Sequence, residues 1–319
     1  MILLNNPGNW SHIYSPLKDA HWNGWTPTDF IFPFFLFIVG IDMTLSMENK
    51  IVRGENKIRI FEGVCRRTLI LFFLGMILAS FPGGRLPIWR LVIPYSVLIT
   101  GFVLLFWNEP PFSLGKTKQE KILKICSFII LIFSILWIIF DFGYFKSLEN
   151  PVRVPGVLQR IAICYLFVSL LMFFFRLRGM IIWFVALVIG YWAFMKLVPP
   201  PLEYTPVLIN NEGLWNDWFD FQILGSNILK VRPDPEGILS TIPSIASTIA
   251  GIICGMCLQS KRDNCQKIAG MFVAGSLLMF LGVCIDYSFP INKVIWSSSY
   301  VVFMAGMALH FLGISIYFI

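Results

Sequence analysis

Long apolar runs recur along this chain and constrain its fold more than any other feature. Each holds about 17 to 25 mostly apolar residues, enough for one helix to cross the roughly 30 Å hydrocarbon core of a bilayer. The pattern predicts an all-α, polytopic transmembrane helix bundle with the lipid bilayer around it. We expect nine spans, at Thr26–Met47, Val64–Phe81, Leu91–Trp107, Ile122–Phe140, Val157–Phe175, Met180–Leu197, Ile238–Leu258, Ile268–Ile285 and Ile295–Phe318.

Composition excludes a soluble globular domain. Of the 319 residues 57% are hydrophobic and 13% are charged, whereas charged residues make up about a quarter of a typical soluble domain. The net charge of +7 does not predict nucleic acid as a partner, because the basic residues are spread over short connections between apolar runs. We interpret Cys254 and Cys257, inside one run, as helix packing rather than metal ligands, and expect no metal.

Lysine and arginine are unevenly distributed over the connections between spans. Fifteen of the 25 lie in four alternate connections, which the positive-inside rule assigns to the cytoplasm: Glu48–Arg67, Asn108–Lys124, Arg176–Gly179 and Gln259–Lys267. The remaining connections are then outside. They include residues 1–25, expected to form an outer catalytic loop, and the long outer loop 198–237, both within a single domain 1–319.

Four polar motifs fall at the outer ends of the expected spans. Polar and ionisable groups at the ends of bundled helices favour a ligand site or a water-filled cavity, so one outward-facing pocket is expected to collect them. The alternative is that they only cap helices and solvate loops, since carboxylates are favourable in the first turn of a helix. The motifs are Asn5–Asp29, Arg153–Arg160, Asp234–Thr241 and Asn292–Tyr300.

His21 is the first candidate for a general base or an acyl acceptor, because imidazole titrates near neutral pH. Asp19 and Asp29 are the alternative bases in the same segment. Trp22 is expected either to stack on a sugar ring or to anchor the chain at the membrane interface, where a His–Trp pair also has a purely structural use. His310, in the middle of the last expected span, is expected to hydrogen-bond a neighbouring helix.

The motifs together carry a resemblance that covers the whole chain in order. The chain resembles the heparan-alpha-glucosaminide N-acetyltransferase family, in particular its bacterial members. The resemblance implies a multi-helix membrane acetyltransferase that takes acetyl from cytoplasmic acetyl-CoA and delivers it to the amino group of a glucosamine-type sugar or oligosaccharide on the outer side. It rests on Asn5–Gly8, Trp22–Gly24, Thr28–Asp29 with Phe32–Phe34, Gly156–Arg160, Asp234–Thr241, Ile291–Lys293 and Trp296–Tyr300.

The chain departs from that family at the candidate base. The family's histidine aligns with Asp19, and His21 stands two residues later. Because residues two apart in an extended segment point to the same side, His21 is able to serve the same pocket, or else the substitution disables the enzyme. The chain is also expected to lack the family's first helix and its C-terminal end.

Roles follow from the chemistry of acyl transfer to an amine. We expect His21, with Asp19 or Asp29 as the fallback, to act as the base, and amide or guanidinium donors to stabilise the charge that develops on the attacked carbonyl. Transfer through an acetyl-histidine and direct transfer need the same residues. The expected substrate-binding residues are Asn5, Trp22, Asn23, Arg160, Asp234, Glu236, Asn292 and Lys293.

Two other functions fit the same helices. A transporter or permease for sugars or acyl-sugars explains the spans and the cavity, although no internal repeat of the kind secondary transporters show is visible. An inactive homologue that only binds a sugar explains the displaced histidine. The resemblance to bacterial members implies a bacterial inner membrane with the catalytic loop on the periplasmic side, and a homo-oligomer is left open.

Overall fold

The computed structural model describes residues 14–80, 97, 156–199, 215–224 and 233–318. Within these residues the chain forms helices and connecting turns, with no strand. It divides into two compact units. The first contains residues 14–55, 167–199, 215–223 and 233–318, and the second contains residues 56–80, 97, 156–166 and 224.

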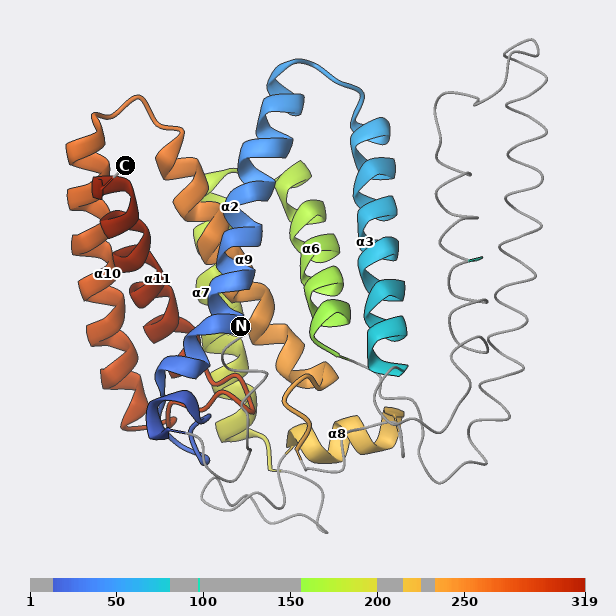
Figure 1. Cartoon of the computed structure of the whole chain (residues 1–319), viewed down its shortest axis with the longest axis vertical. Helices are drawn as coiled ribbons and strands as arrows, with labels where there is room; N and C mark the ends of the chain where they lie inside the picture. The colour runs from blue at the N-terminus through green and yellow to red at the C-terminus, as the bar shows by residue number, and fades with distance from the viewer. Residues whose placement is uncertain (1–13, 81–96, 98–155, 200–214, 225–232, 319) are drawn as a thin grey trace. The chain divides into compact units, whose positions relative to one another are not determined.

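Seven long helices and three short ones make up the described part of the chain (Figure 1). The long helices are α2 (Ile31–Val52), α3 (Lys57–Ser80), α6 (Val157–Phe174), α7 (Leu177–Leu197), α9 (Ile238–Leu258), α10 (Asn264–Asp286) and α11 (Ser298–Phe318). The short helices are η1 (Ser15–Leu17), η2 (Pro27–Phe30) and α8 (Trp215–Leu224).

The membrane class predicted from the apolar runs agrees with the structure. Within the described ranges, six helical segments are long and apolar enough to cross a membrane: Pro27–Met47, Val157–Phe174, Leu177–Leu197, Ile238–Leu258, Asn264–Asp286 and Ser298–Phe318. α3 is helical across Val64–Ser80 of the second expected span but is not one of the six. The spans expected at Leu91–Trp107 and Ile122–Phe140 lie outside the described residues, so the total of nine stays a prediction.

Several helix ends differ from those expected. α11 begins at Ser298 rather than Ile295, because Trp296 has a φ of 53° and a helix cannot pass through that left-handed conformation. α10 begins at Asn264, where the Asp263 side chain accepts a hydrogen bond from the backbone N–H of Cys265. Apolar periodicity marks the buried stretch of a helix and does not mark its capping residues, which is why the prediction missed these ends.

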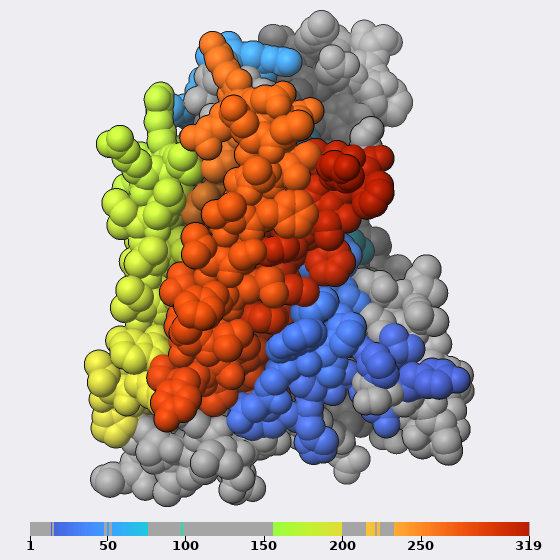
Figure 2. Space-filling view, turned by 90° about the vertical axis from the view of Figure 1, so that its left-hand side faces the viewer, coloured from blue at the N-terminus to red at the C-terminus, as the bar shows by residue number. Residues whose placement is uncertain are grey.

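α9 is the central helix of the first unit. It packs against α2, α7 and α11, while α10 packs mainly against α11. In the most apolar stretch of each helix, 67% of α9 is buried but only 17% of α10. Figure 2 shows α10 (orange) running along one face of the molecule with α11 (red) beside it. The exposed side of α10 carries Val273, Leu277, Phe280 and Val283, as expected for a helix that faces lipid.

Glycines allow α2 and α9 to pack with their backbones in contact. A Cβ atom at Gly251 of α9 would overlap the carbonyl group of Phe37, and one at Gly40 of α2 would overlap the carbonyl oxygen of Thr248. Small residues are the usual means of close helix approach in membranes, where no hydrophobic force draws helices together. The position of α9 in the first unit therefore depends on these two glycines.

Hydroxyl groups on α9 are buried but satisfied within the helix. Thr241 donates to the carbonyl of Gly237 at 2.9 Å, Ser244 to that of Ser240 at 2.8 Å, and Thr248 to that of Ser244 at 3.3 Å. Serine and threonine satisfy their hydroxyl groups in this way inside helices. This polar stripe therefore needs no ligand to explain it.

The prediction for His310 is confirmed. Its Nε2 lies 3.3 Å from the hydroxyl of Ser276 on α10, and its Nδ1 lies 3.0 Å from the carbonyl oxygen of Gly306 in its own helix. The imidazole thus links α11 to α10.

We predict that Gly251→Ala destabilises the protein, because the added methyl group must push α2 away from α9; overpacking of this kind costs about 1–3 kcal/mol. Gly190→Ala is the matched control, since a Cβ atom at Gly190 in α7 meets no atom within 4 Å. We expect the control to be neutral or slightly stabilising. Thermal unfolding of the detergent-solubilised protein measures both, and equal melting temperatures would contradict the glycine contact.

Candidate functional site

The segment from Tyr14 to Phe30, here called the Asp19 loop, is organised by a buried carboxylate. Asp29 has no exposed surface. Its Oδ2 accepts hydrogen bonds from the backbone N–H of Thr26 at 2.8 Å, from the Thr26 hydroxyl at 3.0 Å and from the backbone N–H of Ala20 at 3.2 Å. Thr26 and Asp29 form a capping box at the start of η2, with Pro27 at its first position. The local sequence Thr-Pro-Thr-Asp therefore both starts the helix and fixes the carboxylate.

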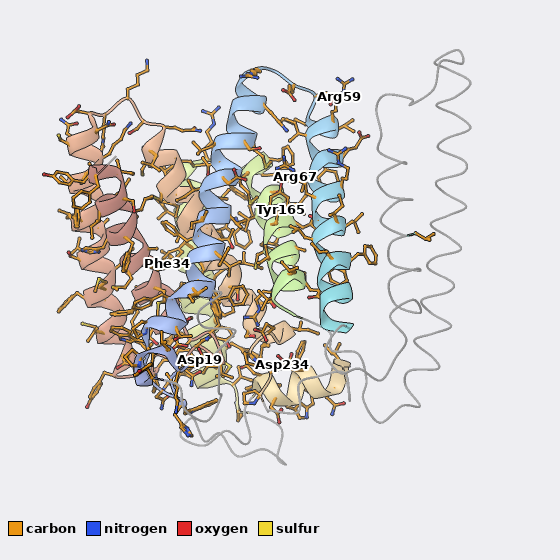
Figure 3. The ribbon with its side chains drawn as sticks, in the orientation of Figure 1. Asp19, Phe34, Arg59, Arg67, Tyr165 and Asp234 are labelled. Atoms are coloured by element: carbon orange, nitrogen blue, oxygen red, sulfur yellow. The ribbon has the colours of Figure 1, made fainter. Side chains whose placement is uncertain are left out.

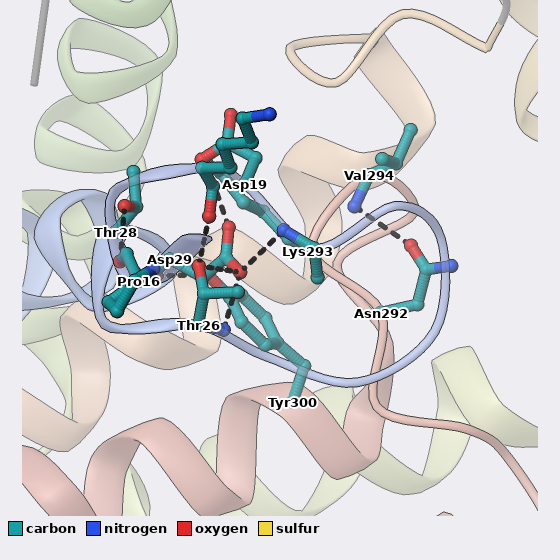
Figure 4. A network of polar contacts seen from close by, with 11 residues as sticks. Pro16, Asp19, Thr26, Thr28, Asp29, Asn292, Lys293, Val294 and Tyr300 are labelled. Atoms are coloured by element: carbon teal, nitrogen blue, oxygen red, sulfur yellow. Dashed lines mark hydrogen bonds and ion pairs between the residues drawn. The ribbon is translucent and has the colours of Figure 1, made fainter. Parts of the chain in front are cut away.

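A lysine from the other end of the chain completes this cluster. Lys293 lies between α10 and α11, in the segment from Tyr287 to Ser297, here called the Lys293 loop. Its Nζ donates to Asp19 Oδ1 at 2.7 Å and lies 3.0 Å from Asp29 Oδ1 (Figure 4). The side chain of Asp19 is 61% exposed and that of Lys293 is 23% exposed. One ammonium group is thus shared between a buried and an exposed carboxylate.

The electrostatics of this cluster favour the charged lysine. Burial by itself lowers the pKa of Lys293, but the hydrogen bond and charge of Asp19 and the charge of Asp29 outweigh it, so the net pKa is raised above its ordinary value of 10.5. A raised lysine pKa means that the stabilisation is fully present below pH about 10.5 and is lost as the pH rises further. Lys293 therefore carries its positive charge throughout the neutral range.

Further hydrogen bonds hold the two loops together. The side-chain amide of Asn292 donates to Asn23 Oδ1 at 3.3 Å, and the backbone N–H of Gly24 donates to the carbonyl of Ile291 at 2.8 Å. From the first turn of α11, the Tyr300 hydroxyl donates to the carbonyl of Asp29 at 2.6 Å. Residues about 270 positions apart in the chain are thereby fixed against each other.

A buried tryptophan side chain connects the Lys293 loop to the helix core. The side chain of Trp296 is almost fully buried, packs edge-on against Phe32 and Tyr300, and donates its Nε1–H to the Ser247 hydroxyl of α9 at 3.1 Å. Its left-handed backbone conformation is unfavourable for a bulky residue and is kept by these contacts. The loop is therefore held in one conformation by the helix core.

A second polar cluster lies at the N-terminus of α9. Asp234 is buried, and its Oδ1 accepts from the backbone N–H of Glu236 at 3.0 Å. Asp220 of α8 accepts from the backbone N–H of Ile238 at 2.8 Å through Oδ1, and its Oδ2 occupies the space where a side chain at Gly237 would lie. A carboxylate at a helix N-terminus is favoured by the exposed N–H groups and the helix dipole. This contact explains the glycine of the Asp-Pro-Glu-Gly motif.

α8 and its carboxylates were not singled out from the sequence. Asp217 and Asp220 are buried, together with Asn216, whose side chain forms a hydrogen bond with the Tyr191 hydroxyl of α7. Their spacing places them on one side of a short helix, opposite Trp218. The helical spacing of these polar residues is present in the sequence Trp215–Leu224, but the long polar segment around it was interpreted as a single loop, 198–237.

The structure brings together several of the predicted site residues within the first unit. Asp19, Asp29 and Lys293 form one cluster, and Asn23 bonds Asn292 beside it. Figure 3 places Asp19 and Asp234 at the same, lower end of the first unit. Arg160 is buried in the first turn of α6, in the second unit. Asn5 lies outside the described residues.

His21 and Trp22 differ from each other in their surroundings. His21 is exposed and makes no hydrogen bond or ion pair with the part of the chain that the structure describes. Trp22 packs against the buried cluster of Tyr191, Leu239, Phe289 and Ile295. Trp22 therefore has a structural contact that the sequence alone did not reveal, while His21 is exposed.

Metal ligation finds no support in the described residues, because no group of three or more His, Cys, Asp or Glu side chains is arranged to hold an ion there. Within α9, Cys254 is buried and Cys257 is exposed.

We predict that Lys293→Met lowers the free energy of unfolding by about 3 kcal/mol, because it leaves the Asp29 carboxylate buried without its counter-ion. Asp19→Asn is the matched control. It removes the exposed partner and keeps the Asp29–Lys293 contact, so a loss below about 1 kcal/mol is expected. Chemical unfolding in detergent at pH 7 measures both changes. Equal losses in the two variants would contradict the buried pair as the stabilising contact.

Comparison with known proteins gives two relatives among curated proteins, and no family model matches the chain. The chain is 25% identical to the heparan-alpha-glucosaminide N-acetyltransferase of Mus musculus over 352 aligned positions, which cover 94% of the chain and 44% of that protein. It is 24% identical to the protein of the same name from Homo sapiens over 359 positions, which cover 97% of the chain and 45% of that protein. The chain thus spans a little under half the length of these relatives, and the family-level relationship expected from its motifs is confirmed.

Proposed function

We propose that this chain, like the relatives it matches, is a membrane-bound N-acetyltransferase. It moves acetyl from acetyl-CoA on the cytoplasmic side to the amino group of a glucosamine-type sugar or oligosaccharide on the outer side of a bacterial inner membrane. The observation that carries the proposal is the meeting of the Asp19 loop with the Lys293 loop through a shared ammonium group. Both loops belong to motifs on which the family resemblance rests.

The distribution of charge along the helices supports this sidedness. The α9–α10 connection carries Lys261 and Arg262, both exposed, and lies at the end of the first unit opposite the Asp19 loop (Figure 1). Basic connections favour the cytoplasmic side. The Asp19 loop and Asp234 then face outward, where a sugar acceptor arrives.

Acyl transfer to an amino sugar needs a base, because only the free amine attacks a thioester. Asp29 is poorly suited to act as this base. Three hydrogen-bond donors contact its Oδ2 and Lys293 contacts its Oδ1, so a proton added to the carboxylate would disturb these contacts. We assign Asp29 the role of positioning the loop. His21 is exposed in the same loop and is the proposed base, with Asp19 as the alternative.

In direct transfer, the sugar ammonium and the acetyl thioester react to give the acetamide, the CoA thiol and a protonated His21. His21 removes a proton from the sugar ammonium, and the amine nitrogen then bonds to the carbonyl carbon of the acetyl thioester. The carbon–sulfur bond breaks and the CoA thiolate leaves. The nitrogen then gives up its second proton to the thiolate, which yields the acetamide and the CoA thiol. The oxyanion needs an amide donor, and the side-chain amide of Asn23, whose Oδ1 accepts a hydrogen bond from Asn292, is the proposed one.

We predict that His21→Ala lowers the rate of acetyl transfer by about 10²- to 10⁴-fold, the usual contribution of a positioned base. Membranes containing the full-length protein are incubated with labelled acetyl-CoA and glucosamine, and labelled N-acetylglucosamine is measured. Lys18→Ala, an exposed change in the same loop, is the matched control and should keep the wild-type rate.

Three results would contradict the proposal in different ways. Absence of product with the wild-type protein, together with uptake of labelled glucosamine, would indicate a transporter. Absence of both would indicate an inactive homologue. Full activity in His21→Ala with loss in Asp19→Ala would retain the acetyltransferase and move the base to Asp19.

A further inference from the structure

The cluster around Lys293 contains more carboxylates than ammonium groups. Asp19 and Asp29 contribute two carboxylates, and Lys293 contributes the single ammonium group between them. Lys18 is exposed in the same loop, but its contact with the cluster is made by its backbone carbonyl, which accepts from the Thr26 hydroxyl. The cluster itself therefore carries a net charge of −1.

That excess charge is located on Asp19. Asp29 is buried and held by three hydrogen bonds as well as the lysine, so its charge is compensated inside the protein. Asp19 is 61% exposed, and its only polar contact among the described residues is that of Oδ1 with Lys293. The second oxygen, Oδ2, accepts no hydrogen bond from the described part of the chain. It remains able to receive a cation from solvent.

Lys293 also shows which kind of cation this carboxylate accepts. Its Nζ is a primary ammonium group bound at 2.7 Å to Asp19, a short, charge-assisted hydrogen bond. A protonated amine of a ligand presents the same three N–H donors. With a ligand ammonium group on Oδ2, positive and negative groups would alternate in the order ligand, Asp19, Lys293, Asp29. Asp29, at the end of this row, is held by the hydrogen bonds of the Asp19 loop.

We propose that Asp19 is the specificity-determining residue for the acceptor, which it binds as a protonated amine through Oδ2, with Lys293 and Asp29 fixing the position of its carboxylate. This inference rests on the proposed function for the identity of the amine. The protonated amino sugar is selected over neutral sugars, and it is held in the loop that also carries His21.

The same contact discriminates substrate from product. Acetylation converts the amine into a neutral amide, which lacks the positive charge and two of the three N–H donors. The charge attraction to Asp19 ends when the amine is deprotonated, and acetylation prevents its return, so the product leaves without competing with the next amino sugar. A neutral sugar without nitrogen is rejected for the same reason.

The test is binding in the absence of acetyl-CoA. The purified full-length protein in detergent is titrated at pH 6 with glucosamine and, separately, with N-acetylglucosamine. We expect wild type to bind glucosamine about threefold more tightly, as is usual for an ion pair at an exposed carboxylate, and added salt should reduce this preference. Asp19→Asn should abolish the preference.

Two further variants guard the interpretation. Asp19→Glu keeps the charge and should retain part of the preference, which loss of folding would not allow. Glu55→Gln removes an exposed carboxylate elsewhere in the first unit and should change nothing. Equal affinity of wild type for the two sugars, or an unchanged preference in Asp19→Asn, would overturn the inference.

This experiment separates the inference from the proposed function. An Asp19-dependent preference for glucosamine in a protein without acetyl transfer would support the binding role and reject the transferase. Acetyl transfer with the same KM for glucosamine in wild type and Asp19→Asn would support the transferase and reject the binding role.

Discussion

The buried carboxylate of Asp29 is the contact on which the described site depends. A charge without solvent is tolerated only with a counter-ion and hydrogen bonds, and Asp29 obtains both from different parts of the chain. Its own loop supplies Thr26 and Ala20, and the segment before α11 supplies Lys293. The requirement to satisfy one carboxylate thus explains why the two loops meet.

The helix core determines where that meeting takes place. Gly40 and Gly251 bring α2 and α9 into backbone contact, and Trp296 joins α9 to the Lys293 loop through Ser247. α2 continues from the Asp19 loop and α11 from the Lys293 loop, so packing of α2 and α11 against α9 presents both loops at one end of the bundle. The loops carry the polar side chains, and the glycine and tryptophan contacts fix the positions of the two loops relative to each other.

In the proposed reaction, each charged group of the Lys293 cluster has a different environment and a different role. Asp29 is buried and fixed, Lys293 is partly buried and shared, and Asp19 is exposed and available. His21 is exposed in the same loop. In the proposal, recognition of a cationic amine falls to Asp19 and removal of its proton falls to His21.

The sequence by itself determined the membrane class, most of the described spans and the family relationship, because apolar length and motif order are local properties of the chain. It also singled out Asp19, Asp29 and Lys293 as polar residues at span ends. Only the tertiary structure decided that these three share one ammonium group, that Trp22 packs into the core and that Asp220 caps α9. Such pairings join residues far apart in the chain, and their geometry is set by helix packing, which no local pattern records.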